Sequence, residues 1–385
     1  MERPDDVELE RLGLYDPTSP DAPERLRLLT RAFELGATLD EIVRAERRGA
    51  NSLILDLVMR PPGETQDLST FAEQSGIDPE FVRRVWLAFG LPDDDTGVPL
   101  RVTPDAAEAL RFTAGMTDYF GEEQVLALAR VVGSSVARIA EAISGVFRIG
   151  IETPQKMTGA PASAVEEQVL AGARYALPLL LEAVSAMFRR HLVLVSYQRW
   201  STDADHAAVT LERTVGFADL VGSTDVLRSQ SVKETAEMVR HFEEQVWDLV
   251  IRAGGRVVKL IGDEAMFVLM DPGRACEVGS ALIDTSAHPV RVGLAHGPVV
   301  ELYGDYYGET VNLAARLVHE APPSTVLVSE PVRDRSDAAL RFEPQEPVTL
   351  KGFADPIPVY TCSRQPRAGS MRSSAGPDHD DAIGG

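Results

Sequence analysis

The periodicity of apolar residues changes once along the chain, near residue 200, and this change limits the fold more than any other feature. Residues 22 to about 200 carry apolar side chains with a period near 3.6, as in "EEQVLALARVVGSSVARIAEAIS", which predicts a succession of helices. After the polar joint "STDADHA", strand-like runs alternate with helical segments. We therefore expect two domains of different class in this chain of 385 residues.

The second half of the chain predicts an α+β fold. A strand at "RTVGFADLVGST" precedes a long helix or helix pair, a hairpin made of "RVVKLIGD" and "EAMFVLMD", a helix, and the strand region "VRVGLAHGPVVELYG". The helix "TVNLAARLVHEA", the strand "STVLVSE" and a closing hairpin, "VTLKGFADPIPVYTC", follow. This β-α-β-β-α-β order indicates a ferredoxin-like core with extra strands.

These patterns predict four regions. An all-α domain spans residues 1–200, a linker 201–212, and the ferredoxin-like domain 213–363. Residues 364–385, rich in Ser, Gly, Pro and Asp, are expected to be disordered.

Composition narrows the functional classes. The net charge of -21 is shared by both halves of the chain, which argues against a nucleic-acid partner. Cys276 and Cys362 are far apart and outside any CxxC spacing, so we expect neither a disulfide framework nor structural zinc, and a reducing cytoplasm fits. The most apolar run, "ALPLLLEAVSAMF", is interrupted by Pro178 and Glu182 and is too short for a membrane span, so a soluble protein is expected.

One segment of the helical half has the spacing of a helix-turn-helix. The stretch "LSTFAEQSGIDPEFVRRVWLAFGLP" contains two helical patterns around a Gly turn, an arrangement that many DNA readers use. Two packed helices without DNA contact account for the same pattern. The acidic surroundings, including "PDDDTG", favour the packed helices.

Two aspartates stand at the ends of neighbouring strand patterns. Asp219 lies in "FADLVGST", and Asp263 lies in the tight turn of "KLIGDEAMFVL". In a ferredoxin-like sheet both can converge at one edge and hold Mg²⁺, because a hard cation requires oxygen ligands. Two such ions can activate an attacking hydroxyl and stabilise a leaving phosphate. Taken singly, a helix cap at Asp219 and a turn role at Asp263 are the stronger interpretations.

A third motif, "GDYYGETVNLAARL", supplies Asp305, Asn312 and Arg316. Asn312 and Arg316 are four residues apart and therefore share one helix face. Arginine offers fixed donors for charge that develops on phosphate, and Asn312 can orient a ribose one turn earlier. A solvated helix face is the alternative, which the apolar flanking residues weaken.

Taken together, "FADLVGST", "KLIGDE" and "DYYGETVNLAAR" resemble the class III nucleotide cyclases over about residues 205–363. The resemblance implies a homodimer with head-to-tail active sites at its interface, which converts ATP to 3′,5′-cyclic AMP and pyrophosphate. It also implies a role for each matching residue. These are Asp219 and Asp263 as ligands of two Mg²⁺ or Mn²⁺ ions per site, Lys259 and Asp305 as adenine readers, Asn312 as the ribose-orienting residue, Arg316 as the transition-state clamp, and Lys351 as a polyphosphate contact, although Phe353 stands where some relatives repeat a lysine.

Two alternatives remain beside an adenylate cyclase. A diguanylate-cyclase-type enzyme also carries a Gly-Asp-Glu hairpin. Its turn requires Gly-Gly-[Asp/Glu]-Glu-Phe, whereas this chain has "LIGDEAM". A non-catalytic nucleotide-binding module, or a DNA-binding regulator, could retain the cyclase fold. Loss of a catalytic residue would favour such a non-catalytic protein, and none of the family positions is lost.

The helical half more loosely resembles the regulatory half of actinobacterial, including mycobacterial, pH-responsive adenylate cyclases. We therefore expect residues 1–200 to control the catalytic dimer through the helix "AVSAMFRRHLVLVSYQRW", with a proton or a lipid-like ligand as the input. His191 on this helix and His206 in the joint are the candidate proton sensors, with protonation near pH ~6.5. An ordinary packed or solvated histidine explains each of them as well.

Overall fold

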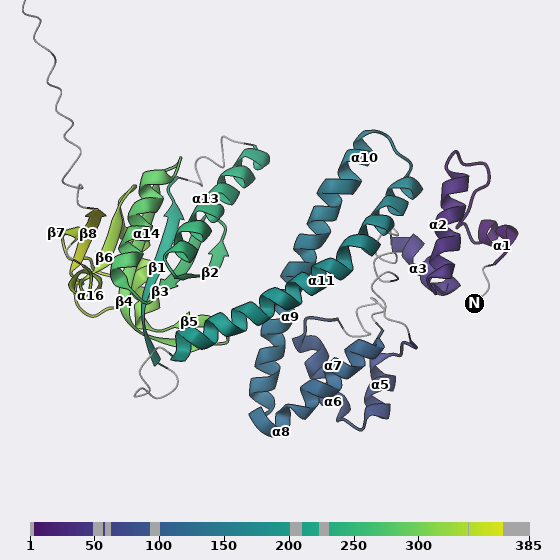
Figure 1. Cartoon of the computed structure of the whole chain (residues 1–385), viewed down its shortest axis with the longest axis horizontal. Helices are drawn as coiled ribbons and strands as arrows, with labels where there is room; N and C mark the ends of the chain where they lie inside the picture. Colours follow the sequence, from purple (N-terminus) through teal and green to yellow (C-terminus); the bar gives the residue numbers. More distant parts are fainter. Residues whose placement is uncertain are drawn as a thin grey trace, which may run out of the picture. The chain divides into compact units, whose positions relative to one another are not determined.

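The computed structural model describes residues 4–48, 57, 63–92, 101–200, 210–222, 231–337 and 339–364. The chain divides into two compact units, Met1–Asp203 and Ala204–Gly385 (Figure 1). The first unit is helical and the second contains a mixed sheet with helices. The predicted combination of an all-α region with a C-terminal α+β domain is confirmed.

Helices make up the described part of the first unit. The predicted succession of helices is present, and the segment "EEQVLALARVVGSSVARIAEAIS" lies within a single helix. One helix ends at Gly115 and the next begins at Thr117, both weak helix formers. The elements are α1 (Asp6–Arg11), α2 (Ala22–Glu34), α3 (Leu39–Arg48), α5 (Leu68–Ser75), α6 (Pro79–Ala88), α7 (Pro104–Gly115), α8 (Thr117–Phe120), α9 (Glu122–Phe147), the π-helical turn η2 (Arg148–Glu152), α10 (Thr153–Met157) and α11 (Ala162–Trp200).

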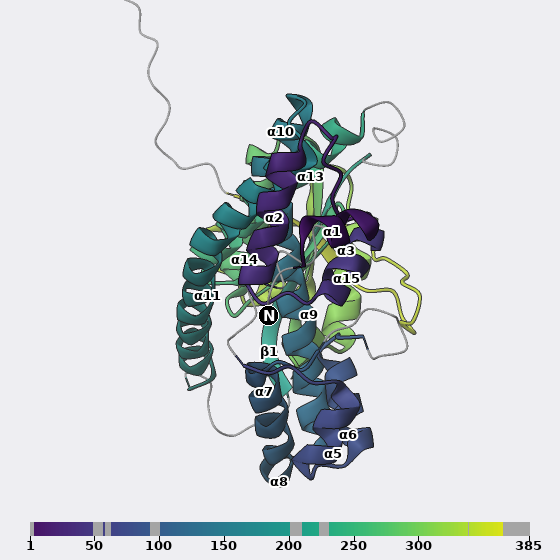
Figure 2. The same ribbon diagram turned by 90° about the vertical axis from the view of Figure 1, so that its right-hand side faces the viewer.

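Helices α5 and α6 form the predicted pair around a glycine. Gly76 ends α5 in the left-handed region, at φ 72°, and the Asp78 side chain caps α6 by accepting from the Phe81 amide at 3.2 Å. The apolar faces of both helices, including Phe71 and Trp86, are buried in one cluster with residues of α7 and α9. Figure 1 and Figure 2 both show α5 to α8 gathered around one end of α9. The packed-helix interpretation accounts for this pair.

Helix α11 changes the expectation about membrane spans. The apolar run "ALPLLLEAVSAMF", predicted to be too short for a span, belongs to a longer stretch, Glu167–Ser196, which is long and apolar enough to cross a membrane by length and composition alone. The helix continues through Pro178. One such helix is weak evidence for a span, because core helices of soluble proteins pass the same test.

The second unit is built on one mixed sheet, in the order β2-β3-β1-β4-β6-β8-β7 with β5 paired to β4. Strands β4 and β6 run parallel, and the other described pairs are antiparallel. The elements are β1 (Thr210–Leu220), α13 (Val232–Arg252), β2 (Arg256–Ile261), β3 (Glu264–Leu269), α14 (Pro272–Thr285), β4 (Val290–Leu302), β5 (Asp305–Tyr307), α15 (Glu309–Glu320), β6 (Val326–Ser329), α16 (Glu330–Asp334), β7 (Leu340–Pro344) and β8 (Val359–Arg364).

Alternation along β1 separates the two faces of the sheet. Ala218 and Leu220 pack in the cluster that includes α13 and α14, whereas Val215 and Phe217 pack in the cluster that includes α15. Figure 1 shows α13 and α14 over the sheet. Asp219 follows the second set, so it lies on the face that α15 covers.

A glycine lets α15 approach the sheet closely. A Cβ added to Gly293 in β4 would lie 2.2 Å from the Val318 amide nitrogen and 2.7 Å from the Ala314 carbonyl oxygen. Both obstacles are backbone atoms of α15, so any larger residue would push the helix away. The position of Asn312 and Arg316 therefore depends on this glycine.

The end of the chain differs from the prediction. The expected closing hairpin is reduced to a single bridge between Val348 and Ile357, and β8 pairs instead with β6 and with β7, a strand that was not predicted. Pro356 and Pro358 remove backbone donors within the segment predicted to be a hairpin, and Pro347 does so just before it.

Buried His296 joins the start of β1 to β4. Its Nδ1 shares a hydrogen bond of 2.9 Å with the Thr214 hydroxyl, and its Nε2 lies 3.5 Å from a Glu212 carboxylate oxygen. Arg335, just after α16, pairs with the same Glu212 oxygen at 3.0 Å. Burial and then the Arg335 charge lower the pKa of His296, and Glu212 partly offsets them.

We predict that His296 makes stability fall in acid. Its pKa is lowered by folding, so below about pH 6.5 the unfolded chain binds a proton that the folded chain does not, and unfolding is favoured as pH falls. Between pH 7.5 and 5.5, Tm should fall more for the wild type than for His296→Gln, which cannot take up that proton. His241→Gln, at an exposed position on α13, is the matched control. Equal pH dependence in His296→Gln and the wild type would contradict the prediction.

Candidate active site

The structure brings Asp219 and Asp263 together at one edge of the sheet. Asp219 is almost fully buried near the end of β1, where its register partner is Glu264. Asp263 lies in the turn between β2 and β3, beside Gly262 at φ 64°, and its carbonyl accepts from the Leu220 amide at 3.1 Å. Burial raises the pKa of Asp219, and the nearby Asp263 charge raises it further.

Arg291 of β4 forms an ion pair with Asp219. Its Nε and Nη2 lie 2.7 and 2.6 Å from the same carboxylate oxygen, Oδ2. Its Nη1 donates to the carbonyl oxygen of His319, near the end of α15, at 3.1 Å. This cation lowers the pKa of Asp219 but does not overcome burial.

A second acid and a histidine complete this edge. Burial raises the pKa of Glu264, and the charges of Asp219 and Asp263 add to that increase. His319 Nε2 lies 3.9 Å from a Glu264 carboxylate oxygen, and the His319 charge acts in the opposite direction. We call these five residues the acidic edge: Asp219, Asp263, Glu264, Arg291 and His319.

Three members of the acidic edge were not predicted as site residues from the sequence: Glu264, Arg291 and His319. The available signal was Arg291, a charge inside the apolar strand pattern "PVRVGLA". Its neighbours Val290 and Val292 face α14, so Arg291 must face the same side of the sheet as Asp219.

The donor set of the acidic edge fits a hard divalent cation. Neither contact from Arg291 uses Oδ1 of Asp219. This oxygen and the Asp263 carboxylate are donors of the kind that a hard cation requires. No group of three or more His, Cys, Asp or Glu side chains within the described ranges is arranged to hold a metal by itself. Two carboxylates suit Mg²⁺ or Mn²⁺, since Mg²⁺ in particular completes its shell with water and substrate phosphates.

Lys259 and Asp305, 46 residues apart, form a second polar group. Lys259 Nζ lies 2.7 Å from Asp305 Oδ2, and the two side chains are 38% and 31% exposed. Asp305 Oδ1 accepts from the Tyr306 amide at 2.8 Å, which orients the carboxylate. Arg256 of β2 donates to the Gly304 carbonyl and holds the preceding turn. A cationic donor and an anionic acceptor are thus presented side by side.

Asn312 and Arg316 lie on the exposed side of α15, four residues apart. His319 continues the same face, at i+7 from Asn312, and reaches the acidic edge. At 1.5 Å per residue, Arg316 and Asn312 lie about 4.5 and 10.5 Å before His319 along the helix axis. No hydrogen bond or ion pair in the described part of the chain joins either of them to Asp219.

Three candidates remain from the sequence. Lys351 is exposed in a turn that follows buried Leu350. His191 is exposed on α11, and His206 lies outside the described residues.

Comparison with known proteins identifies the family. Residues 208–363 match the adenylate and guanylate cyclase catalytic domain. An uncharacterized protein of Mycobacterium tuberculosis H37Rv is 34% identical over 372 residues, covering 94% of each chain. An adenylate cyclase of Streptomyces coelicolor is 35% identical over 264 residues, covering 67% of this chain and 68% of its own. A pH-sensitive adenylate cyclase of M. tuberculosis is 25% identical over 385 residues, covering 94% of this chain and 93% of its own.

The chain belongs to the class III adenylate and guanylate cyclase family. It is a nucleotide cyclase, an enzyme class that generally uses divalent metal ions.

Proposed function

We propose that the protein is an adenylate cyclase, in which the 3′-hydroxyl of ATP attacks the α-phosphate to give 3′,5′-cyclic AMP and pyrophosphate. The observation that carries this proposal is the contact between Lys259 and Asp305. Lysine can only donate hydrogen bonds, and ionised aspartate can only accept them. Adenine offers a ring nitrogen to the lysine and an exocyclic amine to the aspartate, whereas guanine reverses both positions. The adenylate cyclase from S. coelicolor supports the same assignment.

The other candidates take the following parts in this reaction. Asp219 and Asp263 hold two Mg²⁺ or Mn²⁺ ions, which when bound lower the pKa of the attacking hydroxyl and neutralise charge on the leaving group. Asn312 orients the ribose, and the guanidinium of Arg316 donates to the phosphate oxygens as they gain charge. Lys351 contacts the polyphosphate from its exposed turn.

We propose further that each active site is shared by two chains of a homodimer. The acidic edge of one chain holds the metals, while Lys259, Asp305, Asn312 and Arg316 of the other read the base and clamp the substrate. Two facts support this division: Asn312 and Arg316 are exposed, and no described contact joins them to Asp219 within one chain. A cytoplasmic setting follows from ATP as substrate.

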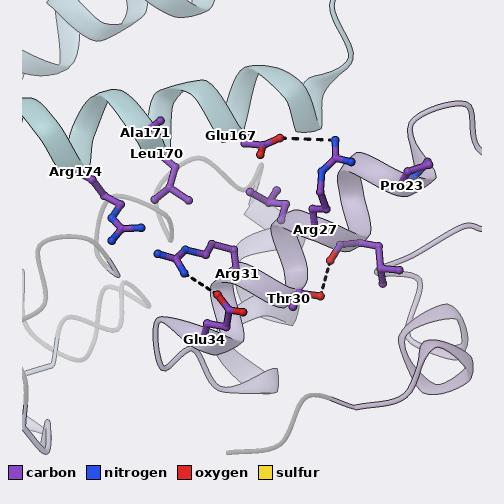
Figure 3. A pocket seen from close by; sticks show the side chains of 11 residues that line it. Pro23, Arg27, Thr30, Arg31, Glu34, Glu167, Leu170, Ala171 and Arg174 are labelled. Carbon is purple, nitrogen blue, oxygen red and sulfur yellow. Dashed lines mark hydrogen bonds and ion pairs between the residues drawn. The ribbon is translucent and has the colours of Figure 1, made fainter.

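A regulatory role for residues 1–200, joined by residues 201–212 to a catalytic domain at 213–363, completes the proposal. A pocket of about 530 Å³ between α2 and α11 supports a lipid-like input (Figure 3). Leu26, Leu28 and Leu170 give it apolar walls. Arg174 also lines it and has no hydrogen bond or ion pair with any described residue. The pH-sensitive relative supports a proton as the alternative input.

Substrate choice tests the base-reading pair. We expect the wild type to convert ATP with a higher kcat/KM than GTP in the presence of Mg²⁺ or Mn²⁺. Lys259→Glu combined with Asp305→Cys should lower the ratio of the two kcat/KM values by at least about tenfold, because the donor and acceptor positions no longer match adenine. Lys233→Glu, at an exposed position on α13, is the control and should leave the ratio unchanged. A ratio that does not move in the double variant would show that these residues do not read the base.

Mixing inactive chains tests the shared site. Asp219→Ala and Asn312→Ala should each be nearly inactive alone, and mixing them should restore cyclic AMP formation. Random exchange makes about half of the dimers mixed, each with one intact site of two, so recovery should approach about a quarter of wild type. Mixing Asp219→Ala with Asp263→Ala is the negative control, since every site then lacks a metal ligand. No recovery despite demonstrated subunit exchange would place each site within one chain.

Truncation tests the regulatory proposal. The full chain and a chain that starts near residue 201 should differ in specific activity and in pH profile between pH 5.5 and 8, at matched dimer content. A proton input through His191 or His206 predicts that the alanine variant of one of them flattens the full-chain profile. A ligand input predicts that Arg174→Ala changes basal activity while the profile is kept. Identical activity and profile with and without residues 1–200 would refute regulation by the helical unit.

A further inference from the structure

We propose that Arg291 is a positioning residue for the cyclase reaction: its guanidinium fixes Oδ2 of Asp219 and leaves Oδ1 free to bind the cation. This inference rests on the proposed role of Asp219 as a metal ligand. It adds a residue of β4 that acts through Asp219 and has no place in the motifs that identified the site.

The sheet register places the two side chains opposite each other. Asp219 of β1 and Arg291 of β4 are direct antiparallel partners, and both face the α15 side of the sheet. The Asp219 side chain is only 9% exposed, and that of Arg291 is 27% exposed. The pair is therefore set by the backbone rather than by two mobile surface side chains, unlike most exposed ion pairs.

The geometry restricts how the carboxylate can turn. The last torsion of an aspartate side chain is broad, so a single point charge would leave the carboxylate free to rotate. Arg291 directs two nitrogens, Nε and Nη2, at Oδ2 from distances of 2.7 and 2.6 Å. A planar guanidinium with two fixed donors defines the position of the oxygen that it holds, which a lysine ammonium cannot do.

The guanidinium is itself anchored. Its third nitrogen, Nη1, donates to the His319 carbonyl oxygen at 3.1 Å. This carbonyl belongs to the last turn of α15, where carbonyl groups lack partners within the helix. All three nitrogens of Arg291 are thus used, two on the carboxylate and one on the helix end, and the arginine cannot swing away without losing both contacts.

The test compares Arg291→Lys and Arg291→Gln in the full chain, with Arg335→Gln as the matched control. Arg335 also pairs with a carboxylate of β1, that of Glu212, but lies outside the acidic edge. Mn²⁺ binding without nucleotide, measured by electron paramagnetic resonance, gives a readout that does not depend on catalysis. Activity assays then separate kcat from KM.

We expect Arg291→Lys to raise the Kd for Mn²⁺ about tenfold and to lower kcat by about ten- to a hundredfold, while KM for ATP changes little because Lys259 and Asp305 are intact. Arg335→Gln should leave all three values unchanged. Unaltered Mn²⁺ affinity and kcat in Arg291→Lys would overturn the inference, as would an equal loss in Arg335→Gln.

A double-mutant cycle keeps the inference testable if one variant folds poorly. If Arg291 acts through Asp219, adding Arg291→Gln to Asp219→Asn should not weaken Mn²⁺ binding further. Additive losses would mean that Arg291 acts elsewhere and would overturn the inference. If Asp219→Asn itself leaves Mn²⁺ binding intact, the metal assignment of the proposed function fails. If Asp219→Asn weakens binding and Arg291→Lys does not, only the role of Arg291 fails.

Discussion

The position of β1 between β3 and β4 is the constraint on which the catalytic unit depends. Both edges of β1 are hydrogen-bonded, so its register fixes Asp219 opposite Glu264 on one side and opposite Arg291 on the other. Because side chains alternate along a strand, a slip of one residue would turn Asp219 toward α14 and bring Ala218 to the acidic edge. Burial of the apolar residues on both faces excludes that slip.

The sequence predicted the elements that have a strong period and missed those that depend on distant contacts. β1, the β2–β3 hairpin, α14, β4 and α15 follow from apolar alternation or from helical spacing with clear turn residues. Strand β7 (Leu340–Pro344) has only five residues and ends in proline, so it carries little signal of its own. It becomes a strand because β8 pairs with it, and β8 is in turn held by β6.

The candidate site shows the same division at the level of single residues. Asp263 could be placed from its glycine turn, and Asn312 with Arg316 from helical spacing. The meeting of Lys259 with Asp305 could not be derived from spacing, because it requires the chain to turn back between β4 and β5. That turn uses two consecutive residues at positive φ, Tyr303 and Gly304, at 51° and 81°. The pairing of Arg291 with Asp219 could not be predicted either, because the two residues lie 72 positions apart in the chain.

Arg291 also has a consequence for a shared active site. It binds Asp219, which would serve one site of the dimer, and the end of α15, whose Asn312 and Arg316 would serve the other. A movement of β1 relative to β4 would therefore displace residues of both active sites at once. The first described residue of β1, Thr210, follows α11 by ten residues in the sequence, and buried His296 ties this end of the strand to β4. If the helical unit controls the enzyme, β1 is a direct route for that control, because the covalent link enters at one end of the strand and the acidic edge lies at the other.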